Sequence, residues 1–510
     1  MHKKLRTKLT SLSALAITSA LVLSGCVANS DAVADSDAVA EESTLTVASP
    51  MSISSIDPHG TGSGDRPTIT VAQHVFDSLI AREGTEFVPS LATDWDNSDP
   101  LVWKLNLVEN ATFHDGTAVT SADVIASYER LIELGGPLVS LWAAVESVEA
   151  DGDHAVVFTT TTPLGTFLSN LALLFIAPAA HLNDPDFFLK PIGSGPFKVE
   201  SFVPSDRITL AANEDYWGGK PDVDILVLRD IPEVSSLIAA LETGEVDLTW
   251  GIAPDQLSAL EANADLTVQS LPSFVYYMNW FNSARAPFSD EKVRQALWHA
   301  VNIEAVVADL FPEAAAVGTA PIPSTVFGYS RQEPYAFDQD KARTLLAEAG
   351  YPNGFDATLD LSVGGGPQNR LIAQSFISDW KAVGVNITLL EKERAVWLED
   401  LVSLNWDMNL LVNSVLTGDA DFTLGRLYTS TANRTGYANP ELDELLAAGK
   451  STTDQGERAE LYAQANEIIW DDAVGIFPME LLANYAWHSN VEGFEPDPNE
   501  TPRFTNVSVK

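Results

Sequence analysis

The sequence predicts a mixed α/β protein built from more than one lobe, and three observations support this prediction. Helical periodicities and short apolar runs with strand character alternate along most of the chain. Hydrophobic residues make up 45% of the composition, which is ordinary for a chain that folds around apolar cores. The chain has 510 residues, which is more than one hydrophobic core usually supports.

The N-terminus has the layout of a leader for export. A basic start precedes an apolar stretch from Leu9 to Leu23, about 15 residues, shorter than the roughly 20 of a membrane-spanning helix. Cys26, the one cysteine in the chain, directly follows Leu23-Ser24-Gly25. This pattern resembles the lipobox of bacterial lipoproteins, so we expect 1–25 to be a signal peptide and Cys26 to be lipidated. The alternative is an ordinary leader that happens to contain a cysteine.

The segment after the cysteine, 26–43, is of low complexity. It repeats a short Ser-Asp-Ala-Val-Ala unit at 30–34 and 36–40, and it contains no aromatic residue. Such a segment cannot bury enough apolar surface to order itself. We expect a flexible acidic tether that ends where the first strand begins, at Thr44.

Capping and turn residues predict the main elements of the folded part. Helices are expected to open at Thr120, Ser289, Asp338 and Asn439, and the last two are expected to end at Gly350 and Gly449. Strand character occurs in apolar or β-branched runs at 44–48, 102–107, 155–159, 224–228, 273–280, 357–363, 385–390 and 407–412. These elements alternate, which supports the α/β class.

The composition and the motif content exclude several functions. The formal net charge of −42 argues against binding to nucleic acid or docking onto anionic lipid, because both need a basic surface. The lone cysteine excludes thiolate metal sites, and the eight histidines form no ligand pair at metal-binding spacing, so no metal or cofactor is expected. No nucleophile elbow, P-loop or dinucleotide fingerprint occurs either. We therefore expect no enzymatic activity, and an extracellular hydrolase remains the alternative class.

Eight short stretches follow one another in an order that is typical of one protein family. They are PSLATDW (89–95), FHDGTAVTSADV (113–124), GSGPF (193–197), NEDYWGGKP (213–221), LETGEVDL (241–248), APFSDEKVRQAL (286–297), LLAEAGYPNG (345–354) and YANPELDELL (437–446). Together they make the chain similar to the large extracytoplasmic solute-binding proteins of ABC importers, the peptide/nickel-binding class known as family 5. A lipobox and a tether ahead of the fold are also typical of that family.

The resemblance implies a two-lobed periplasmic-binding-protein fold of the class II type, with lobes that close on a solute about a hinge near 276–282. It implies that lobe I contains 44–88, 192–276 and 490–510, that an extra domain of 89–191 packs on lobe I, and that lobe II contains 277–489. It further implies a lipid-anchored monomer that delivers a small-molecule or peptide solute to ABC permease subunits.

The expected ligand end departs from the pattern of dipeptide-binding relatives. In those relatives an aspartate takes the peptide amine and an arginine takes the carboxylate. The resemblance places these two positions at Leu416 and Val363, and neither residue carries a charge. A buried charge without its partner costs about 3–5 kcal/mol. We therefore expect that this protein does not hold a free dipeptide in that manner.

Aromatic and amide side chains are the candidates for solute contacts. They suit a longer peptide held by its backbone, and they equally suit an oligosaccharide or another neutral solute. Each of the 12 tryptophans also fits a place in a hydrophobic core, and Asp419 could simply cap a helix. The expected ligand-binding residues are Met51, Trp142, Trp250, Trp280, Trp397, Asn413, Ser414 and Asp419.

Overall fold

A computed structural model describes residues 42–83, 86–363 and 367–510. The expected signal peptide, the expected lipidation site Cys26 and almost all of the expected tether lie outside the described residues. Among the helices of the described residues, none combines the length and the apolar character that crossing a membrane requires. The first strand begins at Thr44, the residue at which the sequence predicts that the fold begins.

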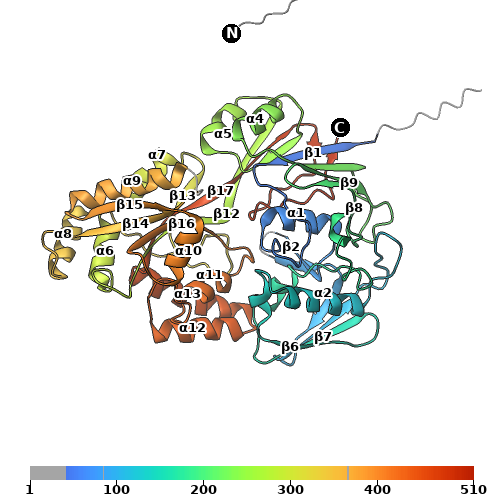
Figure 1. Ribbon diagram of the computed structural model, residues 1–510, viewed down its shortest axis with the longest axis horizontal. Coiled ribbons are helices and arrows are strands. Elements are labelled where there is room, and N and C mark those ends of the chain that lie inside the picture. Colours follow the sequence, from blue (N-terminus) through green and yellow to red (C-terminus); the bar gives the residue numbers. More distant parts are fainter. Residues whose placement is uncertain (1–41, 84–85, 364–366) are drawn as a thin grey trace, which may run out of the picture. The chain divides into compact units, whose positions relative to one another are not determined.

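One large sheet dominates the described part of the chain, where eleven strands belong to it (Figure 1). In spatial order its strands are β15 (Asn386–Lys392), β14 (Asp356–Ser362), β16 (Met408–Ser414), β12 (Leu266–Phe281), β17 (Gly475–His488), β11 (Leu248–Trp250), β1 (Thr44–Ser49), β10 (Ile225–Asp230), β9 (Arg207–Ala212) and β8 (Phe197–Val203), and β13 (Ala315–Val317) pairs with β17. Strands far apart in the sequence are neighbours, since β1 pairs in parallel with both β10 and β11. We call the half around β1, β8, β9, β10 and β11 the β1 lobe, and the half around β13, β14, β15 and β16 the β14 lobe.

The strands β12 and β17 run through both lobes (Figure 1). The first part of β12, up to Pro272, pairs with the end of β17, and the part from Tyr276 onward pairs with its beginning. The register shifts between these two parts, so that 273–275 lie opposite Leu481 alone. Ser273 Oγ donates a hydrogen bond to the Leu481 carbonyl at 2.7 Å. A ladder break of this kind weakens the pairing locally, and it falls just before the crossover expected near 276–282.

A second sheet forms the layer beside the β1 lobe. Its order is β4 (Ala92–Asp96), β5 (Val102–Leu107), β7 (Ala155–Thr160) and β6 (Val145–Ala150), and we call this region the β5 segment. A hairpin of β2 (Ile80–Glu83) and β3 (Glu86–Pro89) leads into it. Buried side chains form separate clusters in the β14 lobe, the β1 lobe and the β5 segment. Separate cores are what a chain of this length requires.

Helices connect and cover these strands. Their bounds are α1 (Arg66–Val75), α2 (Ser121–Leu134), α3 (Phe167–Leu171), α4 (Val234–Glu242), α5 (Pro254–Glu261), α6 (Glu291–His299), α7 (Ile303–Leu310), α8 (Gln339–Glu348), α9 (Pro367–Ala382), α10 (Arg394–Val402), α11 (Ala420–Leu427), α12 (Pro440–Ser451) and α13 (Gln455–Asp471). Near the C-terminus a short ribbon pairs β18 (Val491–Glu492) with β19 (Ser508–Val509). The helices expected to open at Thr120, Asp338 and Asn439 are confirmed.

Two predicted helix boundaries are wrong, the start of α6 and the end of α12. Asp290, rather than Ser289, caps α6 and accepts a hydrogen bond from the Lys292 amide at 2.9 Å. Gly449 does not end α12, which continues to Ser451. The glycine serves packing instead, because a β-carbon there would lie 2.9 Å from Cζ of the Tyr462 ring.

Candidate functional site

Four cavities adjoin one another: three lie where the β14 lobe faces the β1 lobe or the β5 segment, and the fourth lies within the β1 lobe. We name them by one bordering residue each: the Arg82, Asp421, Met51 and Trp250 cavities, with volumes of about 40, 170, 490 and 10 Å³. Neighbouring cavities share bordering residues. Thr417 borders the first two, Arg426 the second and third, and Met51 the third and fourth. A solute in this series would therefore contact both lobes at once.

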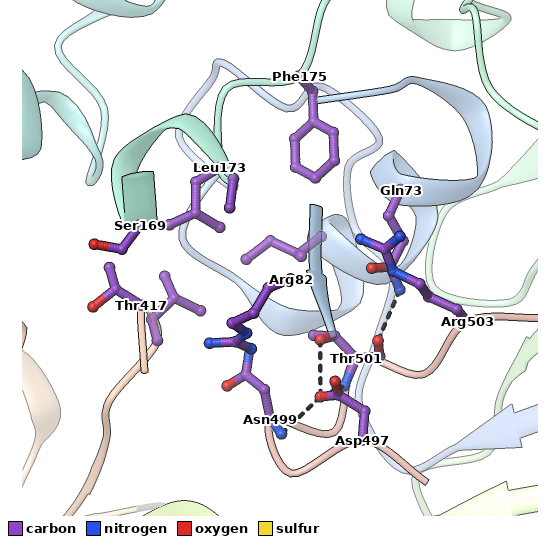
Figure 2. Close-up of a pocket in the computed structure, with 13 residues that line it drawn as sticks. Gln73, Arg82, Ser169, Leu173, Phe175, Thr417, Asp497, Asn499, Thr501 and Arg503 are labelled. Carbon is purple, nitrogen blue, oxygen red and sulfur yellow. Dashed lines mark hydrogen bonds between the residues drawn. The ribbon is translucent and has the colours of Figure 1, made fainter. Parts of the chain in front are cut away.

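The Arg82 cavity is enclosed mainly by polar side chains (Figure 2). The C-terminal loop is fixed beside it, since Gln73 Nε2 on α1 donates to the carbonyl of Thr501 at 2.8 Å. Asp497 Oδ1 accepts hydrogen bonds from the Asn499 amide at 2.7 Å and from Thr501 Oγ1 at 3.3 Å. The cavity is bordered by Ile69, Gln73, Arg82, Ser169, Ala172, Leu173, Phe175, Leu416, Thr417, Asp497, Asn499, Thr501 and Arg503.

Arg82 lies on β2, in the hairpin that leads into the β5 segment, and its side chain lies beside residues of the β14 lobe. Its guanidinium carbon lies 4.6 Å from the centroid of the Phe274 ring. A β-carbon at Gly418 would come within 2.6 Å of Arg82 Nη1, and Gly418 has φ +66°, so only glycine suits that position. Burial lowers the pKa of the Arg82 guanidinium, and the nearby Arg503 charge lowers it too, while Asp497 opposes the change.

Asp419 is already occupied by structural contacts. It caps α11, where its Oδ1 accepts from the Asp421 amide at 3.0 Å. Both of its carboxylate oxygens also lie 3.0 Å from Nη2 of Arg458 on α13. Asp419 is 4% exposed and Arg458 is 1% exposed, so the pair is almost fully desolvated. Although Asp419 borders the Asp421 cavity, its charge is neutralised from within the β14 lobe.

Asp421 differs from its neighbour because its Oδ1 is buried and has no hydrogen-bond partner within the described residues. Burial raises the pKa of this carboxyl to about 6, since the charged form loses its hydration. The Lys450 charge opposes that rise. Both residues border the Asp421 cavity together with hydroxyl and amide groups of the β5 segment, including those of Thr166 and Asn170.

The Met51 cavity is the largest of the four. Met51 follows β1, and Ser414 ends β16, so two of the expected ligand-binding residues border this cavity from opposite lobes. Arg426 on α11 joins them, with its guanidinium carbon 4.6 Å from the centroid of the Phe422 ring. Arg426 Nε donates to the Phe422 carbonyl at 3.0 Å. The remaining guanidinium nitrogens of Arg426 make no further hydrogen bond in the described part of the chain.

The structure places the expected tryptophans mainly in hydrophobic cores. Trp142, Trp280 and Trp397 are at most 7% exposed and border none of the four cavities. Trp280 Nε1 donates to the Tyr428 hydroxyl at 2.9 Å, and Trp397 Nε1 donates to Asn409 Oδ1 at 2.7 Å. Trp142 packs against Tyr128 and Phe158.

Two further expected residues have different surroundings. Trp250 borders the smallest cavity, whose 10 Å³ is close to the lower limit for one water molecule. Asn413 donates to Thr423 Oγ1 at 3.1 Å and borders none of the four cavities. Of the two uncharged anchor positions, Leu416 borders the Arg82 and Met51 cavities, whereas Val363 is 46% exposed and borders none.

The sequence interpretation did not single out Arg82, Asn499 or Arg503. Arg82 lies on β2, and Asn499 and Arg503 lie on the C-terminal loop. The fold brings these segments together at one cavity, which the loop after β16 also borders. A basic residue directly after an apolar run, as at Arg82, is the one local signal that the sequence offers. The described residues contain no cluster of three or more histidine, cysteine or acidic side chains arranged to hold a metal ion.

Comparisons with known proteins identify the family. The profile of the bacterial extracellular solute-binding proteins, family 5, matches residues 86–435. The chain is 30% identical over 450 residues to the glutathione-binding protein GsiB of Pectobacterium atrosepticum, covering 84% of this chain and 86% of that relative.

Solved structures agree with this assignment. The periplasmic binding protein DppA from Helicobacter pylori, in complex with the peptide STSA, is 27% identical, with a TM-score of 0.78 over 91% of this chain and 98% of that one. HbpA2 from Haemophilus parasuis is 26% identical, with a TM-score of 0.83 over 92% of this chain and 100% of that one. The predicted two-lobed binding-protein fold is thereby confirmed. The chain belongs to the bacterial extracellular solute-binding proteins of family 5, the solute receptors of ABC importers.

Proposed function

We propose that this receptor captures a peptide-like solute in the adjoining Arg82, Asp421 and Met51 cavities and delivers it, chemically unchanged, to an ABC permease. One observation carries the proposal: the cavities are bordered by side chains of both lobes and of the β5 segment. The relatives named for glutathione and for a bound peptide support a peptide-like solute over a neutral sugar.

Capture follows from the way the lobes are joined. Among the strands of the described residues, β12 and β17 alone run through both lobes, and their ladder is interrupted at 273–275. A short irregular segment of this kind absorbs the backbone changes of hinge closure. A solute that contacts both lobes stabilises the closed arrangement by its extra contacts there, and the permease would recognise that arrangement.

The proposal includes an anchor and a domain division. Lipidation of Cys26 would hold the monomeric receptor at the outer face of the cell membrane, next to its permease. The proposed division is 44–88 with 192–276 and 490–510, the segment 89–191, and 277–489. The buried clusters cross these bounds in places, since Tyr485 and Trp487 lie in the cluster of the β1 lobe and Ile80 lies in that of the β5 segment. No step of the proposed role breaks a bond.

Calorimetric titration of the purified chain tests this function. The panel comprises glutathione, di- to pentapeptides, neutral oligosaccharides and haem. We expect a peptide-like solute to bind at a stoichiometry of one, and mass spectrometry after prolonged incubation to recover it intact. Hydrolysis of the solute, or binding of oligosaccharides with no response to any peptide, would contradict the proposal.

A further inference from the structure

The Arg82 cavity has a positive charge excess in a protein whose formal net charge is −42. Two arginines, Arg82 and Arg503, border it against a single carboxylate, Asp497. That carboxylate already accepts hydrogen bonds from the Asn499 amide and from Thr501 Oγ1. None of the hydrogen bonds drawn in Figure 2 involves either arginine.

The Arg82 guanidinium is held in place by packing rather than by an ionic partner. Phe274 lies against it, and Gly418 leaves the space that it occupies. Among the side chains that the structure describes, no carboxylate lies within ion-pair distance of it. Placing a cation in a partly buried position without an anion is unfavourable, so such a group is expected where a ligand supplies the anion.

A second unpartnered group borders the same cavity. Asn499 is 2% exposed, and its Oδ1 has no hydrogen-bond partner within the described residues. This oxygen is free to accept a hydrogen bond from an N–H of a solute. A peptide end presents both required groups close together, a carboxylate for the guanidinium and an amide N–H for the side-chain oxygen. The volume of about 40 Å³ is roughly three times the 10–15 Å³ that one water molecule needs, so the cavity has room for a small polar group.

We propose that the Arg82 cavity is an anion subsite that binds a carboxylate of the solute, with Arg82 as its principal contact and Arg503 beside it. The fork of guanidinium N–H donors matches the two oxygens of a carboxylate. This inference rests on the proposed capture of a peptide-like solute. It adds the orientation of the bound solute, whose carboxylate lies in the Arg82 cavity. Closure of the lobes would bring the anion against Arg82 from the side of Thr417 and Gly418.

The test compares matched peptides and matched variants. Di- to pentapeptides and glutathione are titrated calorimetrically as free acids and as C-terminal amides against the native chain, Arg82→Gln, Arg82→Lys and Arg207→Gln. Arg207 pairs with Asp206 at the surface and borders none of the four cavities, so its variant controls for the loss of one positive charge. A second arm measures the thermal midpoint of each protein in 10 mM inorganic phosphate and in chloride at equal ionic strength.

We expect the native chain and Arg207→Gln to bind the free acids about 10- to 100-fold more tightly than the amides. Arg82→Gln should lose this preference, and Arg82→Lys should keep part of it. Phosphate should raise the thermal midpoint of the native chain and of Arg207→Gln more than that of Arg82→Gln.

The two arms separate failure of this subsite from failure of the proposed function. Equal binding of acids and amides by the native chain, or an unchanged preference in Arg82→Gln, would overturn the anion subsite while leaving peptide capture intact. If no peptide binds, peptide capture fails. The phosphate arm then decides the subsite by itself: an Arg82-dependent shift supports it, and identical shifts in all variants overturn it.

Discussion

Two charged groups that border neighbouring cavities are treated differently by this fold. Asp419 is buried against Arg458 of its own lobe, with both carboxylate oxygens at 3.0 Å from one nitrogen. Arg82 borders the adjoining cavity and contacts an aromatic ring, but no carboxylate of the described residues pairs with it. The difference indicates which charges hold the protein together and which are available to a solute.

The same contrast separates Asp419 from Asp421, two residues further along α11. Asp419 has a cationic partner, whereas Asp421 Oδ1 has none in the described part of the chain. A buried ion pair with both partners present holds the folded structure together. A buried carboxylate without a hydrogen-bond partner lowers the stability of the folded protein until it is protonated or binds a ligand. Position in the sequence does not reveal this difference, since both residues belong to one Gly-Asp-Ala-Asp turn.

The largest effect is expected from breaking the satisfied pair. Arg458→Met leaves the Asp419 carboxylate buried without a partner, so the free energy of unfolding should fall by about 3–5 kcal/mol. Urea denaturation at pH 7.5 measures it. The double variant Asp419→Asn/Arg458→Met serves as the control and should recover part of the loss. A loss below about 1 kcal/mol in the single variant would show that the pair is not structural.

Asp421→Asn should change stability in the opposite direction and raise the free energy of unfolding. The folded-state pKa of Asp421 is raised to about 6, above the ordinary value of 3.8, so the ionised carboxyl destabilises the protein above pH 6 and this cost disappears as pH falls toward 4. The variant should be more stable than the native chain by about 1–2 kcal/mol at pH 7.5, after allowance for partial exposure. Urea denaturation from pH 4 to pH 7.5 measures the difference, and a difference that does not change with pH would contradict this account.

A smaller effect should follow from Lys450→Gln. The Lys450 charge holds the pKa of Asp421 below the value that burial alone would give. Without this charge, the pH range over which ionisation of Asp421 destabilises the protein should move upward. The shift should be about half a pH unit or less, because Lys450 is exposed and its charge is screened. Carbon-13 NMR titration of the Asp421 carboxyl follows this shift. A downward shift would mean that another cation governs this group.

The smallest effect on stability is expected at Arg82. Arg82→Gln removes a cation that makes no ion pair among the described residues, so the free energy of unfolding of the unliganded protein should change by only about 0.5 kcal/mol or rise slightly. Urea denaturation of the solute-free chain measures it, with Arg207→Gln alongside. A loss comparable to that of Arg458→Met would assign Arg82 to the structure instead of the solute.

Much of the fold is predictable from the sequence because it is encoded locally. Alternating helical and strand patterns predict the α/β class, and short motifs such as Phe113-His114-Asp115-Gly116 predict the family and thereby the two lobes, as confirmed. Helix starts at Asp338 and Asn439 follow from cap chemistry. The expected end at Gly449 is wrong because contact with Tyr462 on the next helix, and not local turn chemistry, determines that glycine.

The candidate site is less predictable because it is assembled from distant segments. The sequence interpretation included tryptophans such as Trp280 among its candidates, with a core position as the alternative. Local sequence cannot distinguish an aromatic residue in a core from one beside a solute, and Trp280 is 1% exposed. Arg82, Thr417 and Asn499 border one cavity although Thr417 lies 335 positions after Arg82 and Asn499 lies a further 82 positions along the chain. Whether a charge has a partner depends on these long-range contacts, which local sequence patterns do not encode.

A crystal structure of the receptor with its bound peptide-like solute would show which group of the solute occupies the Arg82 cavity. We expect a carboxylate oxygen of the solute about 2.7–3.2 Å from a guanidinium nitrogen of Arg82, with the Asp419–Arg458 pair unchanged. A solute bound outside the Arg82, Asp421 and Met51 cavities, or one that leaves Arg82 without an anion, would contradict this expectation.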